Sequence, residues 1–213
     1  TINLGGTGLS LDTTGNNDSV TGGTGDTVTT QGSGENITLG TGSTLDVASG
    51  SATATLSSGL VTAATGSEVT LSGGSDTISG SGATVNIESG GDTVSASGDT
   101  INLGVAGLTV TDSGNNDSVT GGTGDTVTTQ GSGENITLGT GSSLDVASGS
   151  ATATLSSGEL TAAAGSQVTL NGGSDTISGS GATVTIENSG DTVSASGDTI
   201  NLGGTGLSLD TTG

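Results

Sequence analysis

Small apolar residues recur along the whole chain in pairs two positions apart, separated by stretches rich in glycine, serine and threonine. Such alternation is typical of a β-strand, because successive side chains of a strand point to opposite faces. The first 99 residues contain twelve pairs, about eight residues apart. The pairs are Ile2/Leu4, Leu9/Leu11, Val20/Gly22, Val28/Thr30, Ile37/Leu39, Leu45/Val47, Ala54/Leu56, Val61/Ala63, Val69/Leu71, Ile78/Gly80, Val85/Ile87 and Val94/Ala96.

The breaks between the pairs predict tight turns. They consist of runs such as Gly-Ser-Gly, Gly-Thr-Gly and Gly-Gly-Ser, and glycine readily adopts the positive φ that corners require. We therefore expect units of a strand of about five residues and a turn of three or four. A helix is disfavoured, because each glycine inside it would cost about 1 kcal/mol relative to alanine.

The chain repeats itself every 99 residues. The segment Thr1-Ile2-Asn3-Leu4-Gly5 recurs from Thr100 and again from Thr199. We divide the chain into block 1 (1–99), block 2 (100–198) and the start of block 3 (199–213), which we expect to form one continuous solenoid. The two full blocks differ at 16 of 99 positions. Two changes, Leu11 to Val110 and Val61 to Leu160, keep an apolar residue at a paired position; we expect the others on outward or turn positions, where volume is unconstrained.

Short strands at regular intervals, each with one inward stripe, predict an all-β protein with a parallel β-solenoid fold, a β-roll or β-helix. Two sheets per coil would give coils of roughly 16 to 17 residues, and small core side chains favour this flat form. The alternative is a three-sided prism with coils of roughly 25 residues. Either form divides a block into a whole number of coils, so we expect successive blocks to follow one another in register.

Composition excludes most chemistry. The chain has no Lys, Arg, His, Cys, Met, Pro or aromatic residue, and 21 acidic residues give it a net charge of −21. General bases and activated nucleophiles usually need His, Lys or Cys, so we expect no enzyme. Phosphate binding depends on Lys and Arg, so we expect no nucleic-acid partner. No apolar run reaches the length of a membrane span, so we expect no membrane insertion.

Acidic residues just before strands are the candidate metal ligands. They are Asp18, Asp26, Glu35, Asp76, Asp92, Asp99, Asp117, Asp125, Glu134, Asp175, Asp191 and Asp198. The segment Gly22-Gly23-Thr24-Gly25-Asp26-Thr27-Val28 resembles the calcium-binding nonapeptide of RTX proteins, but it lacks the residue between the third glycine and the aspartate. Calcium needs six to eight oxygen ligands. The resemblance therefore implies possible Ca²⁺ sites but no required cofactor, and the alternative is that mutual repulsion of these acids keeps the protein soluble.

The whole chain resembles the repeat regions of large secreted bacterial β-solenoid proteins, the repetitive adhesins and matrix-fibre proteins, in its composition and its Gly-Asp-Thr-Val/Ile units. The resemblance implies an extracellular structural fibre or adhesin stalk at a cell surface or in a biofilm matrix. Its expected partners are other copies of itself, end to end or side by side. The alternative is a calcium-responsive β-roll or an ice-binding solenoid, the latter because Thr53-Ala54-Thr55 and similar segments would place paired hydroxyls outward.

Overall fold

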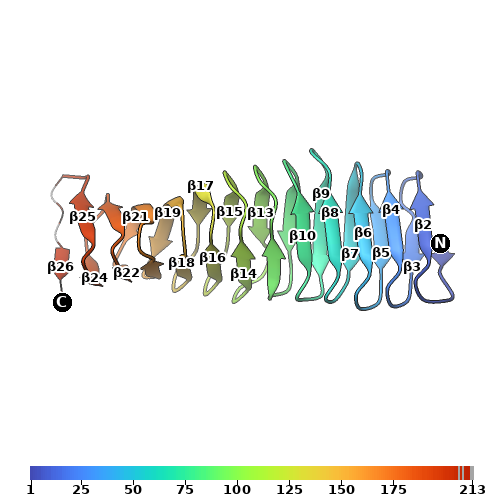
Figure 1. The fold of residues 1–213 in the computed structure, drawn as a ribbon, viewed down its shortest axis with the longest axis horizontal. Helices are drawn as coiled ribbons and strands as arrows, with labels where there is room; N and C mark the ends of the chain where they lie inside the picture. Colours follow the sequence, from blue (N-terminus) through green and yellow to red (C-terminus); the bar gives the residue numbers. More distant parts are fainter. Residues whose placement is uncertain (206, 208, 212–213) are drawn as a thin grey trace. The chain divides into compact units, whose positions relative to one another are not determined.

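The computed structural model describes residues 1–205, 207 and 209–211, and within them every regular element is a β-strand. The chain divides into two compact units, Thr1–Gly104 and Val105–Gly213. Each unit is a two-sheet parallel β-solenoid (Figure 1). The predicted fold class is thus confirmed, including the preferred two-sided coil, and the three-sided alternative is wrong.

The strands are short, as the pairs predicted. The first unit contains β1 (Ile2–Asn3), β2 (Ser10–Thr13), β3 (Ser19–Thr21), β4 (Thr27–Thr30), β5 (Glu35–Thr38), β6 (Thr44–Val47), β7 (Ser51–Thr55), β8 (Leu60–Ala63), β9 (Glu68–Ser72), β10 (Thr77–Gly80), β11 (Thr84–Ile87), β12 (Asp92–Val94) and β13 (Thr100–Leu103). The second unit contains β14 (Thr109–Asp112), β15 (Ser118–Thr120), β16 (Thr126–Thr129), β17 (Ser132–Thr137), β18 (Ser143–Val146), β19 (Ser150–Ser156), β20 (Glu159–Ala162), β21 (Gln167–Gly173), β22 (Thr176–Ser180), β23 (Thr183–Ile186), β24 (Asp191–Ser196), β25 (Thr199–Leu202) and β26 (Leu209–Thr211).

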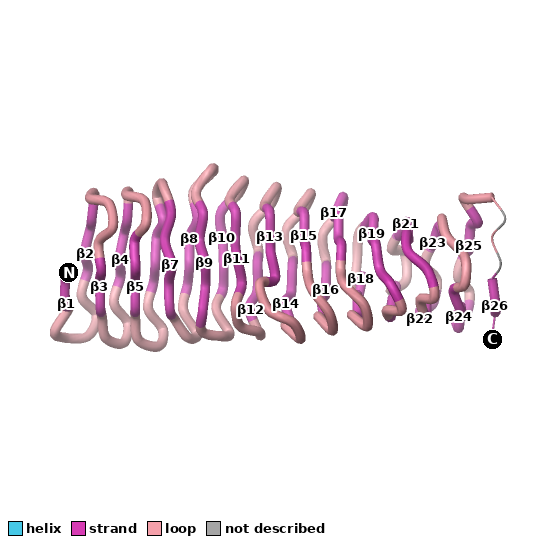
Figure 2. The backbone as a smooth tube through the Cα atoms, turned by 180° about the vertical axis from the view of Figure 1, so that it is seen from behind, coloured by secondary structure: helices cyan, strands magenta, loops and turns pink. Residues whose placement is uncertain are grey.

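Consecutive strands lie in opposite sheets. Within each unit the odd-numbered strands form one parallel sheet and the even-numbered strands form the other, and loops join the two sheets at both edges (Figure 2). A full coil is therefore two strands and two turns, about 17 residues long. In β4, β6 and β8, for example, Val28 pairs with Leu45 and Leu45 with Val61. Parallel backbone ladders thus bond consecutive coils within each unit.

The core is a thin layer between the two sheets. Its side chains are Val, Ile, Leu and Ala stacked in columns, and Val28, Leu45 and Val61 are each 0% exposed. Burying a Val, Leu or Ile side chain contributes about 1.5–3 kcal/mol relative to leaving it exposed. A single coil buries few such side chains, so the fold derives its stability from stacking many coils.

The inward stripe of β2 extends one position beyond the predicted pair. Thr13 is buried at 5% exposure, and although Leu9 in the first coil is 39% exposed, its counterpart Leu108 in block 2 is buried at 6%. Because Thr13 is the register partner of buried Thr30, strand β2 points Leu11 and Thr13 inward. The change from Thr13 to Asp112 between the blocks therefore lies on the inward face, which corrects the expectation that it was outward.

The blocks do not close in register. The column of paired residues that starts at Ile2 runs through Val20, Ile37 and three further coils to Leu103. Leu103 lies two positions past Ile101, the residue that repeats Ile2 in the sequence. In the second unit the column that starts at Thr109 ends at Asp210, again two positions past the residue that repeats Thr109 in the sequence. The expectation of exact closure is wrong. The shift is even, so each side chain keeps its inward or outward orientation.

Gly73 shows how closely the coils approach. It has a φ of 121°, and a Cβ atom there would overlap the carbonyl oxygen of Leu56 in the preceding coil. We expect Gly73→Ala to lower the free energy of unfolding by about 2 kcal/mol, because both the clash and the backbone strain would have to be relieved. Gly5→Ala is the control, since a Cβ at Gly5 would meet nothing within 4 Å. Chemical denaturation of the two variants would contradict this expectation if their midpoints were equal.

Candidate functional site

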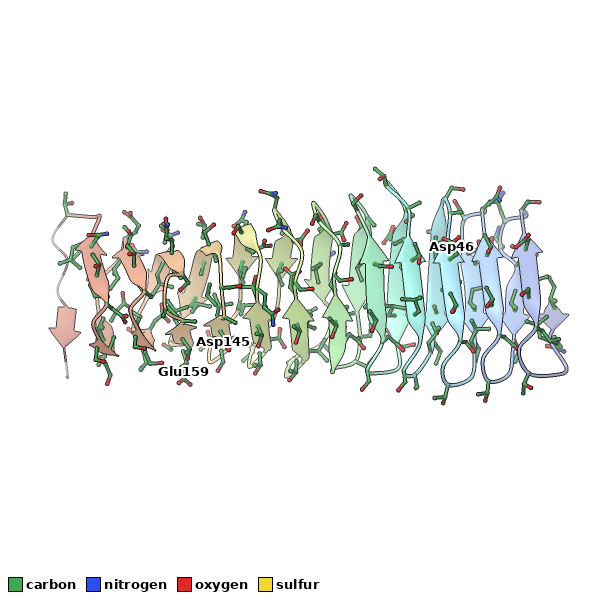
Figure 3. All side chains as sticks on the ribbon, viewed as in Figure 1. Asp46, Asp145 and Glu159 are labelled. Carbon is green, nitrogen blue, oxygen red and sulfur yellow. The ribbon has the colours of Figure 1, made fainter. Side chains whose placement is uncertain are left out.

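The predicted metal ligands lie at the corners of the coils and point inward. Ten of the twelve are buried, whereas Asp18 and Asp198 are half-buried. The buried ten are Asp26, Glu35, Asp76, Asp92, Asp99, Asp117, Asp125, Glu134, Asp175 and Asp191. Other acids, such as Asp46, Asp145 and Glu159, lie on the outer surface (Figure 3).

In the first unit, Asp26 illustrates the role of a carboxylate at a corner. Its Oδ1 accepts a hydrogen bond from the backbone N–H of Leu9 at 2.8 Å, and its Oδ2 accepts one from Gly23 at 2.6 Å. Leu9 belongs to the preceding coil and Gly23 to the turn that contains Asp26. The RTX-like motif thus uses its aspartate as an acceptor for backbone N–H groups, which lie where the strand ladder is interrupted.

The same arrangement recurs in the second unit. The carboxylate of Asp125 accepts hydrogen bonds from Leu108 N at 2.9 Å and from Gly122 N at 2.6 Å. Its own N–H donates to the hydroxyl of Ser142, which in turn donates to the carbonyl of Gly122. The network joins three consecutive coils.

Later coils carry a ladder of aspartates. Asp76 Oδ1 accepts from Gly59 N at 2.7 Å, and Asp92 Oδ1 accepts from Asp76 N at 2.8 Å. In each bond the carboxylate reaches back one coil to an N–H group 16 or 17 residues earlier. In the second unit, Asp175 and Asp191 make the corresponding bonds. At the opposite corner, Asp99 and Asp198 accept from Ala83 N and Ala182 N in the same way.

Burial changes the acidity of these groups. The pKa of Asp92 is raised to about 6, mainly by desolvation and to a lesser degree by the neighbouring charge of Asp76, while backbone hydrogen bonds act in the opposite direction. Desolvation also raises the pKa of Asp76, Asp99 and Asp175. These carboxyl groups therefore hold protons more tightly than they would in an unfolded chain.

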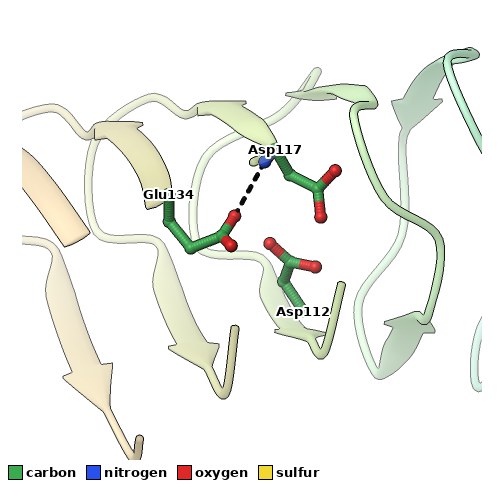
Figure 4. Close-up of side chains that lie close together, drawn as sticks. All are labelled: Asp112, Asp117 and Glu134. Carbon is green, nitrogen blue, oxygen red and sulfur yellow. Dashed lines mark hydrogen bonds between the residues drawn. The ribbon is translucent and has the colours of Figure 1, made fainter. Parts of the chain in front are cut away.

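Asp112, at the end of β14, was not among the predicted ligands. Its side chain is 0% exposed and lies beside those of Asp117 and Glu134 (Figure 4). One carboxylate oxygen of each residue lies within 4.8 Å of the other two. A signal was present in the sequence: Thr30 was assigned inward, and position 13 lies one coil of 17 residues before it. The prediction that coils are about 17 residues long would have placed Asp112 in the core.

Backbone N–H groups contact this cluster from the turn before β15. Glu134 accepts from Asn116 N at 3.1 Å and from Asp117 N at 3.0 Å, and Asp112 Oδ1 accepts from Gly114 N at 3.1 Å. Desolvation, followed by the charge of Glu134, raises the pKa of Asp112 to about 6. Desolvation also raises the pKa of Glu134. The structure thus brings together two predicted ligands and one that was not predicted.

The outer faces carry threonine ranks and shallow depressions. Thr152, Thr169 and Thr185 are register partners on the outer side of β19, β21 and β23. They line a depression of about 220 Å³. In the first unit the corresponding rank reads Thr53, Thr70 and Asn86. The rows of hydroxyl groups are therefore short.

No protein-family model, curated protein or solved structure matches this chain. In the described part of the chain, no helix is long and apolar enough to cross a membrane.

Proposed function

We propose that this chain is a segment of an extracellular structural fibre or adhesin stalk, at a cell surface or in a biofilm matrix. The observation that supports the proposal most is the identity of the coil-to-coil pairing in the two blocks. Thr27 pairs with Thr44 in the first unit, and Thr126 pairs with Ser143 in the second. Sixteen substitutions leave this pairing unchanged. Each added block therefore contributes more coils without a new kind of contact.

Length is the property that such repetition controls. The strand-to-strand spacing is about 4.8 Å, so six coils add roughly 29 Å. We expect proteins with four and six blocks to lengthen by roughly 29 Å per block, as measured by electron microscopy or small-angle X-ray scattering. A length that grew only with the square root of block number would indicate a flexible chain and contradict the proposal.

The location needs a separate test. Immunogold labelling of intact source cells, with an antibody to the outer face of the solenoid, should decorate filaments or matrix outside the cells. Labelling that appears only after permeabilisation would contradict the extracellular part of the proposal. The length measurement would still decide whether the chain is a rigid spacer.

A further inference from the structure

The carboxyl groups of Asp112, Asp117 and Glu134 form a closed acidic cluster inside the second unit. Asp112 ends β14, Asp117 precedes β15 and Glu134 lies in β17. All three are at most 1% exposed, and their carboxyl groups point toward one another (Figure 4). The cluster therefore gathers oxygen atoms from two sheets and from successive coils at one corner.

Nothing in the chain can neutralise this cluster by an ion pair, because the chain contains no Lys, Arg or His. Asp112 Oδ2 is buried, and it has no hydrogen-bond partner among the described residues. A buried charge without a partner is costly, so either a bound cation or a proton must offset it.

The ligand chemistry selects the kind of cation. The side-chain ligand atoms of the cluster are all oxygens, which suits hard cations such as Ca²⁺ and Mg²⁺, whereas zinc sites of the usual kind need Cys or His. Calcium binds oxygen at about 2.3–2.6 Å, so separations up to 4.8 Å between ligand atoms fit around one such ion. Three carboxylates carry six oxygens, of which Asp112 Oδ1 and both oxygens of Glu134 also accept backbone N–H groups. Magnesium dehydrates reluctantly and usually keeps several waters, which a fully buried site does not favour.

The first block provides an internal comparison. The equivalent residues there are Thr13, Asp18 and Glu35, so a neutral hydroxyl replaces the third carboxylate. Asp18 is also half-buried rather than buried. Among the described residues, the cluster in the second unit is the one group of three acids with this geometry. The site therefore arises from a single substitution between the two blocks.

We propose that Asp112, Asp117 and Glu134 bind one divalent cation, with calcium preferred, which ties β14, β15 and β17 together. The site differs from the RTX-like motif, since Asp125 of that motif is not among the three clustered acids. It also does not depend on the fibre function, because a solenoid of any role would hold it.

Calorimetric titration of the full, chelator-stripped chain with CaCl₂, at pH 7.5 and 150 mM NaCl, tests the proposal. We expect one saturable site per chain and a rise of several degrees in the melting temperature. Asp112→Thr installs the residue of the first block, which the same fold already accommodates, and should weaken calcium binding at least tenfold. Thr13→Asp should raise the stoichiometry towards two. Magnesium chloride should bind at least tenfold more weakly than CaCl₂.

Asp145→Ala is the matched control, because it removes the same charge from the outer surface and should leave the titration unchanged. Diffuse screening of the −21 charge would make Asp145→Ala and Asp112→Thr equivalent, and the proposal would then be wrong. The proposal would also fail if the parent chain showed no saturable calcium site while carboxyl NMR showed Asp112 protonated at pH 7.5. A Thr13→Asp variant that failed to fold would leave the decision to Asp112→Thr.

Discussion

Replacing Asp125 with alanine should lower the free energy of unfolding by about 3 kcal/mol. Its two carboxylate oxygens accept backbone N–H groups from Leu108 and Gly122, and its side chain is 0% exposed. Hydrogen bonds to a charged acceptor contribute about 1.5–3 kcal/mol each, and alanine would leave both donors without their acceptor. The loss would extend beyond one coil, because the network also includes Ser142. Thermal melting and chemical denaturation followed by circular dichroism would measure it.

Two further variants separate hydrogen bonding from charge. Asp145→Ala removes one negative charge from the outer face of β18 and should change stability by less than about 0.5 kcal/mol. Asp125→Asn keeps one acceptor oxygen but replaces the other with an NH₂ donor. We therefore expect its free energy of unfolding to lie between those of the parent chain and Asp125→Ala, or lower. Equal stability of Asp125→Ala and Asp145→Ala would show that the corner carboxylates do not hold the coils together.

Chelator-treated protein should become less stable as the pH rises from about 4 to 7, which is the reverse of ordinary acid denaturation. Burial raises the pKa of Asp92 and Asp112 to about 6, and it raises the pKa of Asp76, Asp99, Glu134 and Asp175 in the same direction. The folded state therefore binds more protons than the unfolded state between the two pKa values. The stabilisation is complete below the unfolded pKa near 4 and is lost as the pH passes the folded pKa near 6.

The expected loss is on the order of 2 kcal/mol for each of the two groups with the largest shift. Asp92 faces Asp76, and Asp112 faces Asp117 and Glu134, so the repulsion within each group acts in the same direction. Melting temperatures at constant ionic strength, measured in EGTA from pH 4 to pH 8, would show the trend. The double variant Asp92→Asn, Asp112→Thr should flatten it, because both replacements are neutral and asparagine can still accept the N–H of Asp76. A melting temperature that rose steadily to pH 7 would refute the expectation.

The coil geometry could be predicted from the sequence because it depends on local alternation. Pairs such as Val85/Ile87 and Val94/Ala96 alternate with outward polar residues, and two pairs per coil give a coil length close to the observed 17 residues. Closely packed sheets also require small side chains, and the chain contains no large ones.

The inward direction of the acids was not predicted, although the alternation already encoded it. Asp26, Asp76 and Asp92 each stand two positions before a buried residue of the core, so the same alternation that assigns Val28 inward assigns Asp26 inward. Asp and Glu side chains are seldom fully buried in proteins, so composition alone points the opposite way from the alternation. The backbone donors that make burial tolerable lie one coil away, where only the folded register reveals them.

The two-residue advance in register determines where an outer residue reappears in a long array. A residue of one block and its counterpart in the next would be displaced by about 6.6 Å along the strand direction. With about 17 residues per coil, roughly eight blocks would carry the pattern once around the circumference. In a long fibre built in this way, each outer feature would follow a helical path around the fibre axis. Such a fibre would present the same features to neighbours on every side.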